Sequence, residues 1–589
     1  MFLLLALFAG PVAADLPLVR LQEIASAGAP GLALERLDAE QPDPGTSPDR
    51  WVEWERARIS ILVDAGAWRR AVQRLADLPP ATPEPFRRWA IEQRAAFHLE
   101  LDESSAARGL LRDLIWTAGP GATPEELRHW RRLVVRSYLV DRRTADAVTA
   151  LRRYDQDYDE SDREWAVLRT RVLLAAGRAN EAVRRLPAET EGELRSLSML
   201  AHLRAGTRAA DEIHGRASAA AADDKRPDVE HARMWFIAAE AATLQAAPAL
   251  HALAIERAAA LSDRLPASDT LFIVRGDALW SAWLDFGLHV GNRRELLIGD
   301  DDAWFAASRA SMPKYPVRAR ALVAVVALRG SGANRVRAHG RLLDLLADSE
   351  PGMATARRAY LDAARYANTR EIPENVRYRL VDDALAQNAV ERATGLLATL
   401  TEAPDDVDAF SWQLLRARVL VLGGRFEEGV DGLRRVLDEN ARLDKEQLDR
   451  FLQVIFDLQG AEEHESALAL LQRLGLRDLP PQRRRELLYW QAESREAQQR
   501  YQDAARLYLR SATLIDPRGG DPWGQTALYQ AAGMLTELGL VGDARRIYRR
   551  LLRVTENENR RSRLRHRLQQ LRLRQSAPGD VPAPADTDS

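Results

Sequence analysis

The sequence predicts an all-α fold, a solenoid of antiparallel helical hairpins stacked in tandem. One observation is composition: Ala, Leu, Arg and Glu dominate the 589 residues, and runs that alternate apolar and polar residues are rare. The second is a small residue that recurs at steps of 35 to 40 residues within a helix–turn–helix phrase. The third is length, since a chain this long exceeds one compact core and favours several domains or an elongated stack.

Composition also narrows the class of function. Apolar residues make up 46 % and charged residues 29 % of the chain, which argues against disorder as its default state. The net charge of −2 gives no general attraction to nucleic acid or to anionic membranes. Lysine occurs three times, so 84 − 3 = 81 of the basic residues are Arg, which we attribute to coding bias because 86 acidic residues balance them. The chain has no cysteine, which excludes disulfides and Cys-ligated metals.

The first segment, residues 1–14, predicts a secretory signal peptide. An apolar run from Phe2 to Ala9 is broken by Gly10 and Pro11, and small residues then precede a cleavage site after Ala14. A periplasmic or envelope-associated bacterial protein is therefore expected. No Lys or Arg precedes the apolar run, so two alternatives stay open: a start further upstream, or a buried N-terminal segment of a cytosolic protein.

Residues 15–214 follow as N-terminal repeats. The phrase Gly-Arg-x-x-Glu-Ala-Val-x-x-Leu begins at Gly177 and has a close copy at Gly424. Its Gly, or a polar substitute, ends one helix in a tight turn. The small residue five positions later lets the next helix pack closely. These small residues are Ala33, Ala71, Ala107, Ala147 and Ala182, and near the C-terminus Ala393, Gly429, Ala467, Ala504 and Ala544.

The middle, residues 215–375, departs from this pattern and is rich in large aromatic residues. They are Trp235, Phe236, Phe272, Trp280, Trp283, Phe286, Trp304 and Phe305. We expect irregular hairpins whose aromatic side chains fill a core. One alternative is an apolar groove for a partner. Another is an enzyme site near His231, His251 and His289.

Residues 376–574 complete the predicted array. Ala504, Tyr508 and Ser511 with Pro517 reproduce the second helix of the tetratricopeptide repeat, and Ala544, Tyr548 and Leu551 repeat the pattern. The chain therefore resembles the tetratricopeptide repeat (TPR) family. The resemblance implies a right-handed superhelix whose first helices line the concave face. It also implies a non-enzymatic scaffold for a protein or peptide partner.

The resemblance further implies which residues face the groove. The matching positions are Glu486, Tyr489, Glu493, Glu496, Thr526, Tyr529, Thr536 and Glu537. This wall combines acidic side chains with two tyrosines, so we expect it to accept a basic or neutral segment.

The end of the array is strongly basic. Twelve arginines fall between Arg545 and Arg574, and Leu564, Leu568 and Leu571 form an apolar stripe at helical spacing. We predict a helix that caps the stack. The alternative is a basic patch for anionic lipid headgroups or an acidic partner. That patch would consist of Arg560, Arg561, Arg563, Arg565 and Arg567. Nucleic acid is not expected, because few stacking aromatic residues interleave. A disordered tail, 575–589, is predicted to follow.

No residues predict catalysis, a cofactor or a metal. Phosphate loops and nucleophile elbows are absent from the sequence, and the histidines lack metal-ligand spacing. The Asp155-x-Asp157-x-Asp159 run lacks the Gly and Glu of a calcium loop, so we expect it to precede a helix capped near Asp162. Asp300 to Asp302 likewise predict a helix start.

Two other functions would fit the same predicted architecture. One is an accessory role in envelope polysaccharide export or cell-wall assembly, and the other is that of a cytosolic regulator.

Overall fold

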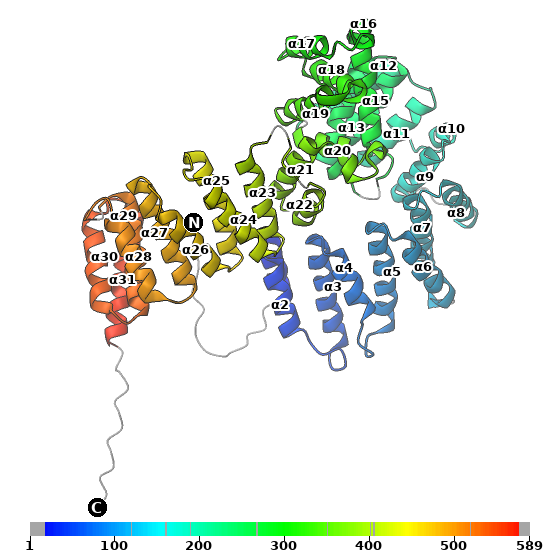
Figure 1. Cartoon of the computed structure of the whole chain (residues 1–589). Helices are drawn as coiled ribbons and strands as arrows, with labels where there is room; N and C mark the ends of the chain where they lie inside the picture. The colour runs from blue at the N-terminus through cyan, green and yellow to red at the C-terminus, as the bar shows by residue number, and fades with distance from the viewer. Residues whose placement is uncertain are drawn as a thin grey trace, which may run out of the picture. The chain divides into compact units, whose positions relative to one another are not determined.

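The computed structural model of the chain describes residues 18–118, 121–158, 162–188, 190–266, 269–349, 352–400, 402–404, 407–518 and 520–576, which form helices joined by turns and short loops. These ranges hold 31 α-helices and no strand, which confirms the predicted fold class (Figure 1). None of the described helices combines the length and the apolar character that a membrane crossing requires. The predicted signal peptide, 1–14, and residues 577–589 of the predicted tail lie outside the described ranges.

The helices form two compact units. Unit 1 ends at Arg365, and unit 2 begins at Tyr366. The repeats of unit 1 pack each helix against the next along the chain, as helical hairpins do. Their helices are α1 (Leu18–Ser26), α2 (Pro30–Glu40), α3 (Pro48–Asp64), α4 (Trp68–Ala76), α5 (Glu84–Glu100), α6 (Ser104–Ala118), α7 (Pro124–Val140), α8 (Thr144–Asp157), α9 (Arg163–Ala175), α10 (Ala179–Arg184), α11 (Gly192–Arg204) and α12 (Ala210–Ala221).

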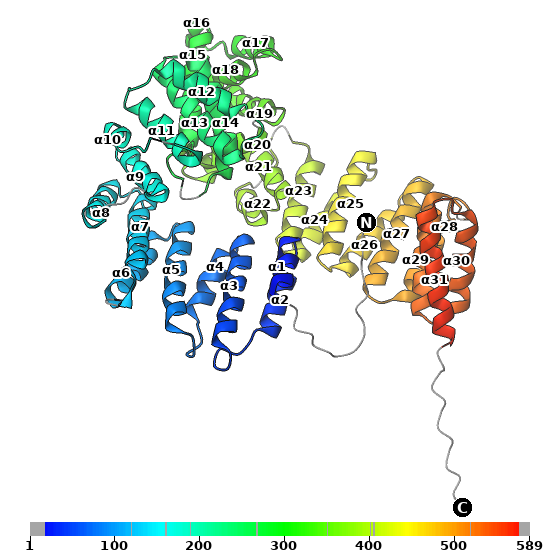
Figure 2. The ribbon, with the colours of Figure 1, turned by 180° about the vertical axis from the view of Figure 1, so that it is seen from behind.

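The rest of unit 1 abandons strictly sequential packing. Here α15 packs on both α18 and α20, and α14 also reaches α18 and α20. Figure 2 shows these helices gathered into a bundle. The helices are α13 (Asp228–Leu244), α14 (Pro248–Leu261), α15 (Gly276–Val290), α16 (Arg293–Leu297), α17 (Asp301–Ser311), α18 (Pro316–Arg329), α19 (Gly332–Ala347) and α20 (Gly352–Leu361).

The aromatic residues of the middle mostly fill this bundle. Seven of the eight are buried, with Phe236 the partly exposed exception. The rings of Trp280 and Trp283 meet edge to face at 5.3 Å, and Trp280 contacts Tyr360 in the same way at 5.4 Å. This confirms the interpretation as core packing over that of an open apolar groove.

Unit 2 returns to the regular stack, in which each helix packs against the next from α21 to α24 and from α25 to α31. In addition, α23 packs on α25 and α24 on α26, so helices of like position are neighbours. The helices are α21 (Glu374–Ala386), α22 (Val390–Leu397), α23 (Ala409–Leu422), α24 (Phe426–Glu439), α25 (Lys445–Gly460), α26 (His464–Gly475), α27 (Pro481–Ala497), α28 (Tyr501–Thr513), α29 (Pro522–Glu537), α30 (Val541–Val554) and α31 (Glu558–Ser576).

The backbone confirms the predicted repeat register. In all ten repeats the residue five positions before the small residue has a positive φ, as the tight turn requires. Five of these residues are glycines, Gly28, Gly66, Gly177, Gly424 and Gly539, and five are not, Asp102, Arg142, Asn388, Glu462 and Gln499. The small residues themselves are buried. A Cβ on Gly429 would lie 2.7 Å from Val421 Cγ2, which explains why this position must be small.

Exchanging the residue types at two such turns should move stability in opposite directions. A side chain in the left-handed region costs about 1–2 kcal/mol, and the flexibility that glycine adds to the unfolded chain offsets about half of this. Gln499→Gly should therefore raise the free energy of unfolding of unit 2 by about 0.5–1 kcal/mol. Gly424→Ala, where the new Cβ meets nothing within 4 Å, should lower it by a similar amount. Urea denaturation followed by circular dichroism measures both, and shifts of the same sign would contradict the argument.

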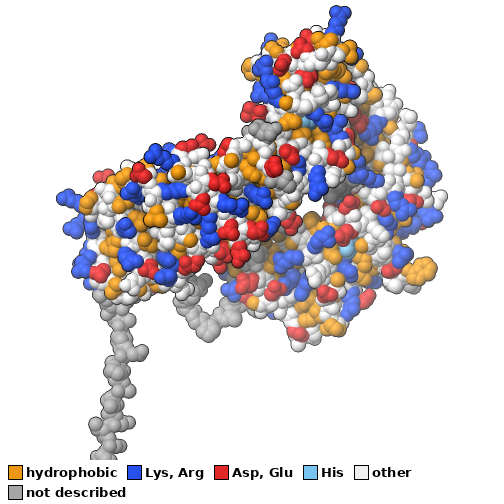
Figure 3. Space-filling view, viewed as in Figure 1, with side chains coloured by type: hydrophobic (Ala, Val, Ile, Leu, Met, Phe, Trp, Pro, Cys, Tyr) orange, Lys and Arg blue, Asp and Glu red, His pale blue; other side chains and the backbone are white. Residues whose placement is uncertain are grey.

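Many arginines link neighbouring repeats. Arg136 pairs with Glu100, Arg204 with Glu240 and Arg485 with Asp521, and each pair joins residues 36 positions apart, about one repeat. Basic and acidic side chains are accordingly interspersed on the face seen in Figure 3. The guanidinium fork suits such carboxylate contacts. The attribution of the many arginines to coding bias alone therefore missed their structural role, which is to form ion pairs between neighbouring repeats.

Both predicted helix starts are confirmed. The Asp162 side chain accepts a hydrogen bond from the backbone N–H of Trp165 at the start of α9, at 2.9 Å. Asp300 accepts one from the backbone N–H of Ala303 in α17, at 3.1 Å. Asp155 accepts a hydrogen bond from Trp165 Nε1, so it supports packing here, while Asp159 lies outside the described residues.

Candidate functional site

Two cavities adjoin each other at the end of unit 2, between its last helices. The larger cavity has a volume of about 600 Å³ and the smaller about 170 Å³, and Tyr529 lines both. The larger cavity is lined by Glu496, Tyr501, Tyr529, Gln530, Gly533, Met534, Thr536, Glu537, Tyr548, Arg567, Gln570, Leu571 and Leu573. The smaller cavity is lined by Gln525, Thr526, Tyr529, Leu551, Thr555, Arg560, Arg563 and Leu564.

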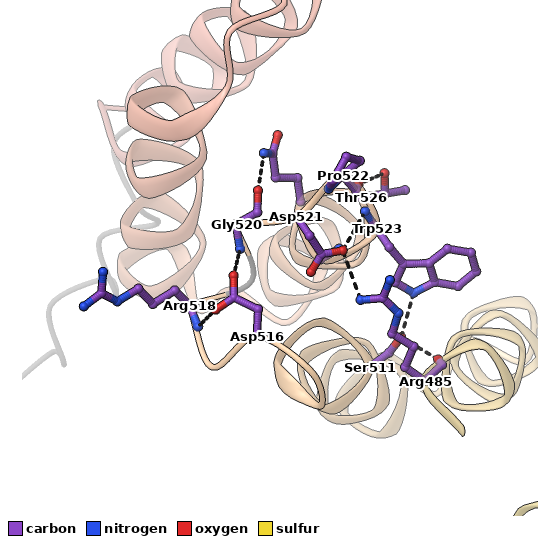
Figure 4. Close-up of polar contacts among 11 residues, drawn as sticks. Arg485, Ser511, Asp516, Arg518, Gly520, Asp521, Pro522, Trp523 and Thr526 are labelled. Atoms are coloured by element: carbon purple, nitrogen blue, oxygen red, sulfur yellow. Dashed lines mark hydrogen bonds and ion pairs between the residues drawn. The ribbon is translucent and has the colours of Figure 1, made fainter. Parts of the chain in front are cut away.

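A polar network fixes α29, which carries Tyr529, against α27 (Figure 4). Asp521 caps α29 by accepting hydrogen bonds from the backbone N–H groups of Trp523 and Gly524, both at 3.2 Å. The same carboxylate pairs with Arg485 of α27 at 3.0 Å. Trp523 Nε1 donates to Ser511 Oγ of α28 at 3.2 Å. The start of α29 is therefore held by both preceding helices.

The turn that leads into α29 is held by Asp516. Its carboxylate accepts hydrogen bonds from the backbone N–H groups of Arg518 and Gly520, at 2.8 and 2.7 Å (Figure 4). These bonds hold the pKa of Asp516 below its ordinary value. The Asp516 carboxylate therefore stabilises the turn in which it lies.

Of the predicted acidic residues on α27, Glu496 lines the larger cavity, whereas Glu486 and Glu493 line neither cavity. Glu496 accepts a hydrogen bond from the Tyr508 hydroxyl at 2.6 Å, and Glu486 pairs with Arg483 at 2.7 Å. Half-buried Glu493 makes no hydrogen bond or ion pair among the described residues. Burial and the neighbouring charge of Glu496 raise its pKa. Of the three predicted acidic residues on α27, Glu493 is thus the one left without a balancing contact.

Glu493 should make stability depend on pH. A raised pKa in the folded state means that the folded unit binds a proton more readily than the unfolded chain, so this residue's contribution falls as pH rises through that pKa. Glu493→Gln should therefore stabilise unit 2 at neutral pH. The difference from wild type should shrink below the ordinary Glu pKa of about 4.3, where both states carry the proton. Thermal unfolding across this range measures the effect, and a difference independent of pH would contradict it.

Aromatic rings cluster at the site, and among them Tyr529 and Tyr548 line the larger cavity. Tyr489 contacts Tyr508 at 5.1 Å and Trp523 at 5.4 Å, and Tyr529 contacts Tyr548 at 5.6 Å between ring centroids. Burial raises the pKa of Tyr489, and that of Tyr548 to about 12, so both hydroxyls stay protonated at neutral pH. Such side chains offer an apolar ring and a polar tip to a ligand.

Helix α31 packs its predicted apolar stripe against the preceding helices of unit 2. Leu564 and Leu571 are buried and Leu568 is half-buried in one cluster with α28, α29 and α30. The helix extends to Ser576, two residues into the segment predicted as a tail.

The five predicted basic residues of α31 point in different directions. Arg561 donates to the carbonyls of Leu552 and Thr555 at 3.0 Å, and Arg565 pairs with Glu558. Arg567 Nε donates to the Tyr529 hydroxyl at 3.3 Å inside the larger cavity. Arg560 and Arg563 line the smaller cavity.

The structure thereby joins two sites that the sequence analysis kept apart. Thr526, Tyr529, Thr536 and Glu537 of the predicted groove line the same cavities as Arg560, Arg563 and Arg567 of the predicted patch. Tyr501, Gln530, Met534 and Tyr548 were missed as lining residues. Their helical spacing from predicted groove positions could have indicated some of them.

The histidines of the middle serve local structure where contacts are seen. His231 Nε2 bonds to the Asp223 carbonyl at 2.9 Å, and His289 is exposed. Fully buried His339 bonds to the Tyr360 hydroxyl at 2.8 Å, and burial lowers its pKa to about 3, so it is neutral. Across the described ranges, no group of three or more His, Asp or Glu side chains is placed to hold a metal ion.

No family model and no curated protein matches the chain. Among solved structures it is similar to one of the APC/C hetero-tetramer Cut9-Hcn1, with 11 % identity, coverage of 94 % of this chain and 95 % of that chain, and a TM-score of 0.29. It is similar to yeast Tom70, with 11 % identity, coverage of 85 % and 98 %, and a TM-score of 0.23. It is also similar to the pentatricopeptide repeat protein PPR10 from maize, with 14 % identity, coverage of 96 % and 90 %, and a TM-score of 0.28.

These TM-scores lie below 0.5 and carry no argument, so the assignment rests on the chain itself. Its repeat phrase, its left-handed turns at the predicted positions and its stacked hairpins give it the architecture of a TPR-like helical-repeat protein.

Proposed function

We propose that this protein is a non-enzymatic scaffold that holds an extended segment of a protein partner against the first helices of the last repeats of unit 2. The observation that carries the proposal is Tyr529, which lines two adjoining cavities between helices α27 to α31. Repeat stacks present such continuous surfaces, and extended peptides use them through side-chain pockets. Tyrosine-rich pockets with a polar rim suit protein recognition.

A photo-crosslinking amino acid at two positions tests this function. Thr526 is exposed and lines the smaller cavity, whereas Gln502 is exposed on α28 and lines neither cavity. With the probe at Thr526, we expect adducts with a defined partner in cells, and competition by a soluble fragment of that partner. The probe at Gln502 is the matched control. Equal adduct yields at both positions would overturn the proposal.

We further propose that the protein is exported and acts at the bacterial envelope. The support is the apolar segment of residues 1–14 with its small residues before the predicted cleavage site. Mass spectrometry of the protein purified from its native cells should find a mature chain that begins at Asp15. A chain that retains residues 1–14 in the cytosol would overturn this proposal.

A further inference from the structure

We infer that the segment bound at this site carries opposite charges near its two ends, with a Lys or Arg over α27 and an Asp or Glu over α31. The inference rests on the proposed function and specifies its ligand. It follows from the charged side chains of α27 and α31 that lack partners. It also follows from the position of Tyr529, which lies between these two groups of side chains.

The neighbouring carboxylates of α27 favour a cationic group in the ligand. Glu496 lines the larger cavity and accepts the hydrogen bond from the Tyr508 hydroxyl. Glu493 lies one helical turn before it, outside the lining of either cavity, and makes no ion pair among the described residues. Two half-buried carboxylates this close repel each other, as the raised pKa of Glu493 reflects. An ammonium or guanidinium group placed here would offset that repulsion.

The unpaired arginines of α31 favour an anionic group in the ligand. Arg560 and Arg563 line the smaller cavity, and neither side chain makes a hydrogen bond or ion pair among the described residues. The nearest acidic residue along the helix, Glu558, is occupied by Arg561 and Arg565. Arg560 lies in the first turn of α31, where the helix dipole adds positive potential, although its backbone N–H already donates to Asn557 Oδ1 at 3.0 Å. A carboxylate placed here would meet two free guanidinium groups.

The region between these two groups of side chains is closer to neutral. Arg567 donates a hydrogen bond to the Tyr529 hydroxyl, and this bond, together with the nearby charge of Glu537, raises the pKa of Arg567. Leu551 and Leu564 line the smaller cavity next to Tyr529, and Met534 lines the larger one. This stretch suits an apolar residue of the ligand between its charged ends.

Helix spacing sets the distance between the two charges. Neighbouring packed helices lie about 10 Å apart, so α27 and α31, with α29 between them, are separated by about 20 Å. An extended chain covers about 3.3 Å per residue. The basic and acidic residues of the ligand should therefore stand about six positions apart.

Fluorescence anisotropy with synthetic peptides tests the inference. Three end-blocked peptides share one neutral, partly apolar core and carry Lys and Glu, two Lys, or two Glu about six positions apart. The Lys/Glu peptide should bind about tenfold more tightly than either of the others, an advantage that high salt should reduce.

Charge reversals assign each end of the ligand. Glu493→Lys should shift the preference to the Glu/Glu peptide, and Arg563→Glu to the Lys/Lys peptide, by about tenfold each. Arg549→Glu makes the same charge change at an exposed position of α30 that lines neither cavity. It should leave the order of affinities for the three peptides unchanged.

Two outcomes overturn the inference. One is equal binding of all three peptides, or an order that the reversals do not change. The other is binding by none of them. In either case, crosslinking at Thr526 but not at Gln502 would leave the proposed scaffold function intact.

Discussion

Replacing Glu256 with alanine should lower the free energy of unfolding of unit 1 by about 3–5 kcal/mol. Glu256 is fully buried in α14, and Arg320 of α18 is 3 % exposed and donates to it from Nε at 2.9 Å. Trp283 of α15 also donates to the carboxylate, at 2.7 Å. The substitution would leave a buried guanidinium without its countercharge and an indole N–H without its acceptor, and both losses destabilise.

The matched control for Glu256 is an exposed pair in the same unit. Arg204 and Glu240 are 29 % and 30 % exposed, so Arg204→Ala should cost less than about 1 kcal/mol. Urea denaturation followed by circular dichroism compares both variants with wild type. Replacing Glu256 by Met together with Arg320 by Leu should recover much of the loss, because no buried charge then remains. Equal costs for Glu256→Ala and Arg204→Ala would refute the assignment.

Adding one methyl group at Gly287 should also destabilise unit 1. Gly287 lies in α15 where it crosses α18, and a Cβ there would meet both the Ala321 carbonyl oxygen and Val325 Cγ2 at 2.5 Å. The helices would have to move apart, so we expect Gly287→Ala to cost about 1–3 kcal/mol.

A second helical glycine provides the control for Gly287. Gly215 lies in α12, and a Cβ there would meet nothing within 4 Å. Gly215→Ala should therefore raise stability by up to about 1 kcal/mol through helix propensity alone. Thermal unfolding of both variants gives the comparison, and a stabilised Gly287→Ala protein would contradict the close approach of α15 and α18.

The regular repeats were predictable because local rules encode them. Gly424 ends a helix and Gly429 must be small, and both requirements are visible within one short phrase. The bundle in unit 1 was not predictable in the same way. Gly287 stands in an apolar helical run without any turn signal, and its role depends on α18, which follows three helices later.

The candidate site was predicted in part. Positions such as Tyr529 follow from the resemblance to the TPR family, and the structure places Tyr529 in both cavities, whereas Glu486, Tyr489 and Glu493 line neither. The contribution of Arg567 depends on how α31 folds back against α29, which is a tertiary property. From sequence alone, the arginines of α31 therefore looked like a separate basic surface.

The ion pairs between neighbouring repeats have a consequence for how the stack comes apart. Pairs such as Arg204–Glu240 and Arg485–Asp521 join one repeat to the next near the surface, alongside an apolar core that itself continues from hairpin to hairpin. Salt screens exposed charges but strengthens or spares apolar burial. Rising ionic strength should thus weaken the ionic part of the coupling between repeats and leave its apolar part in place. The unfolding transition should then broaden as the salt concentration rises, and its breadth should change more than its midpoint.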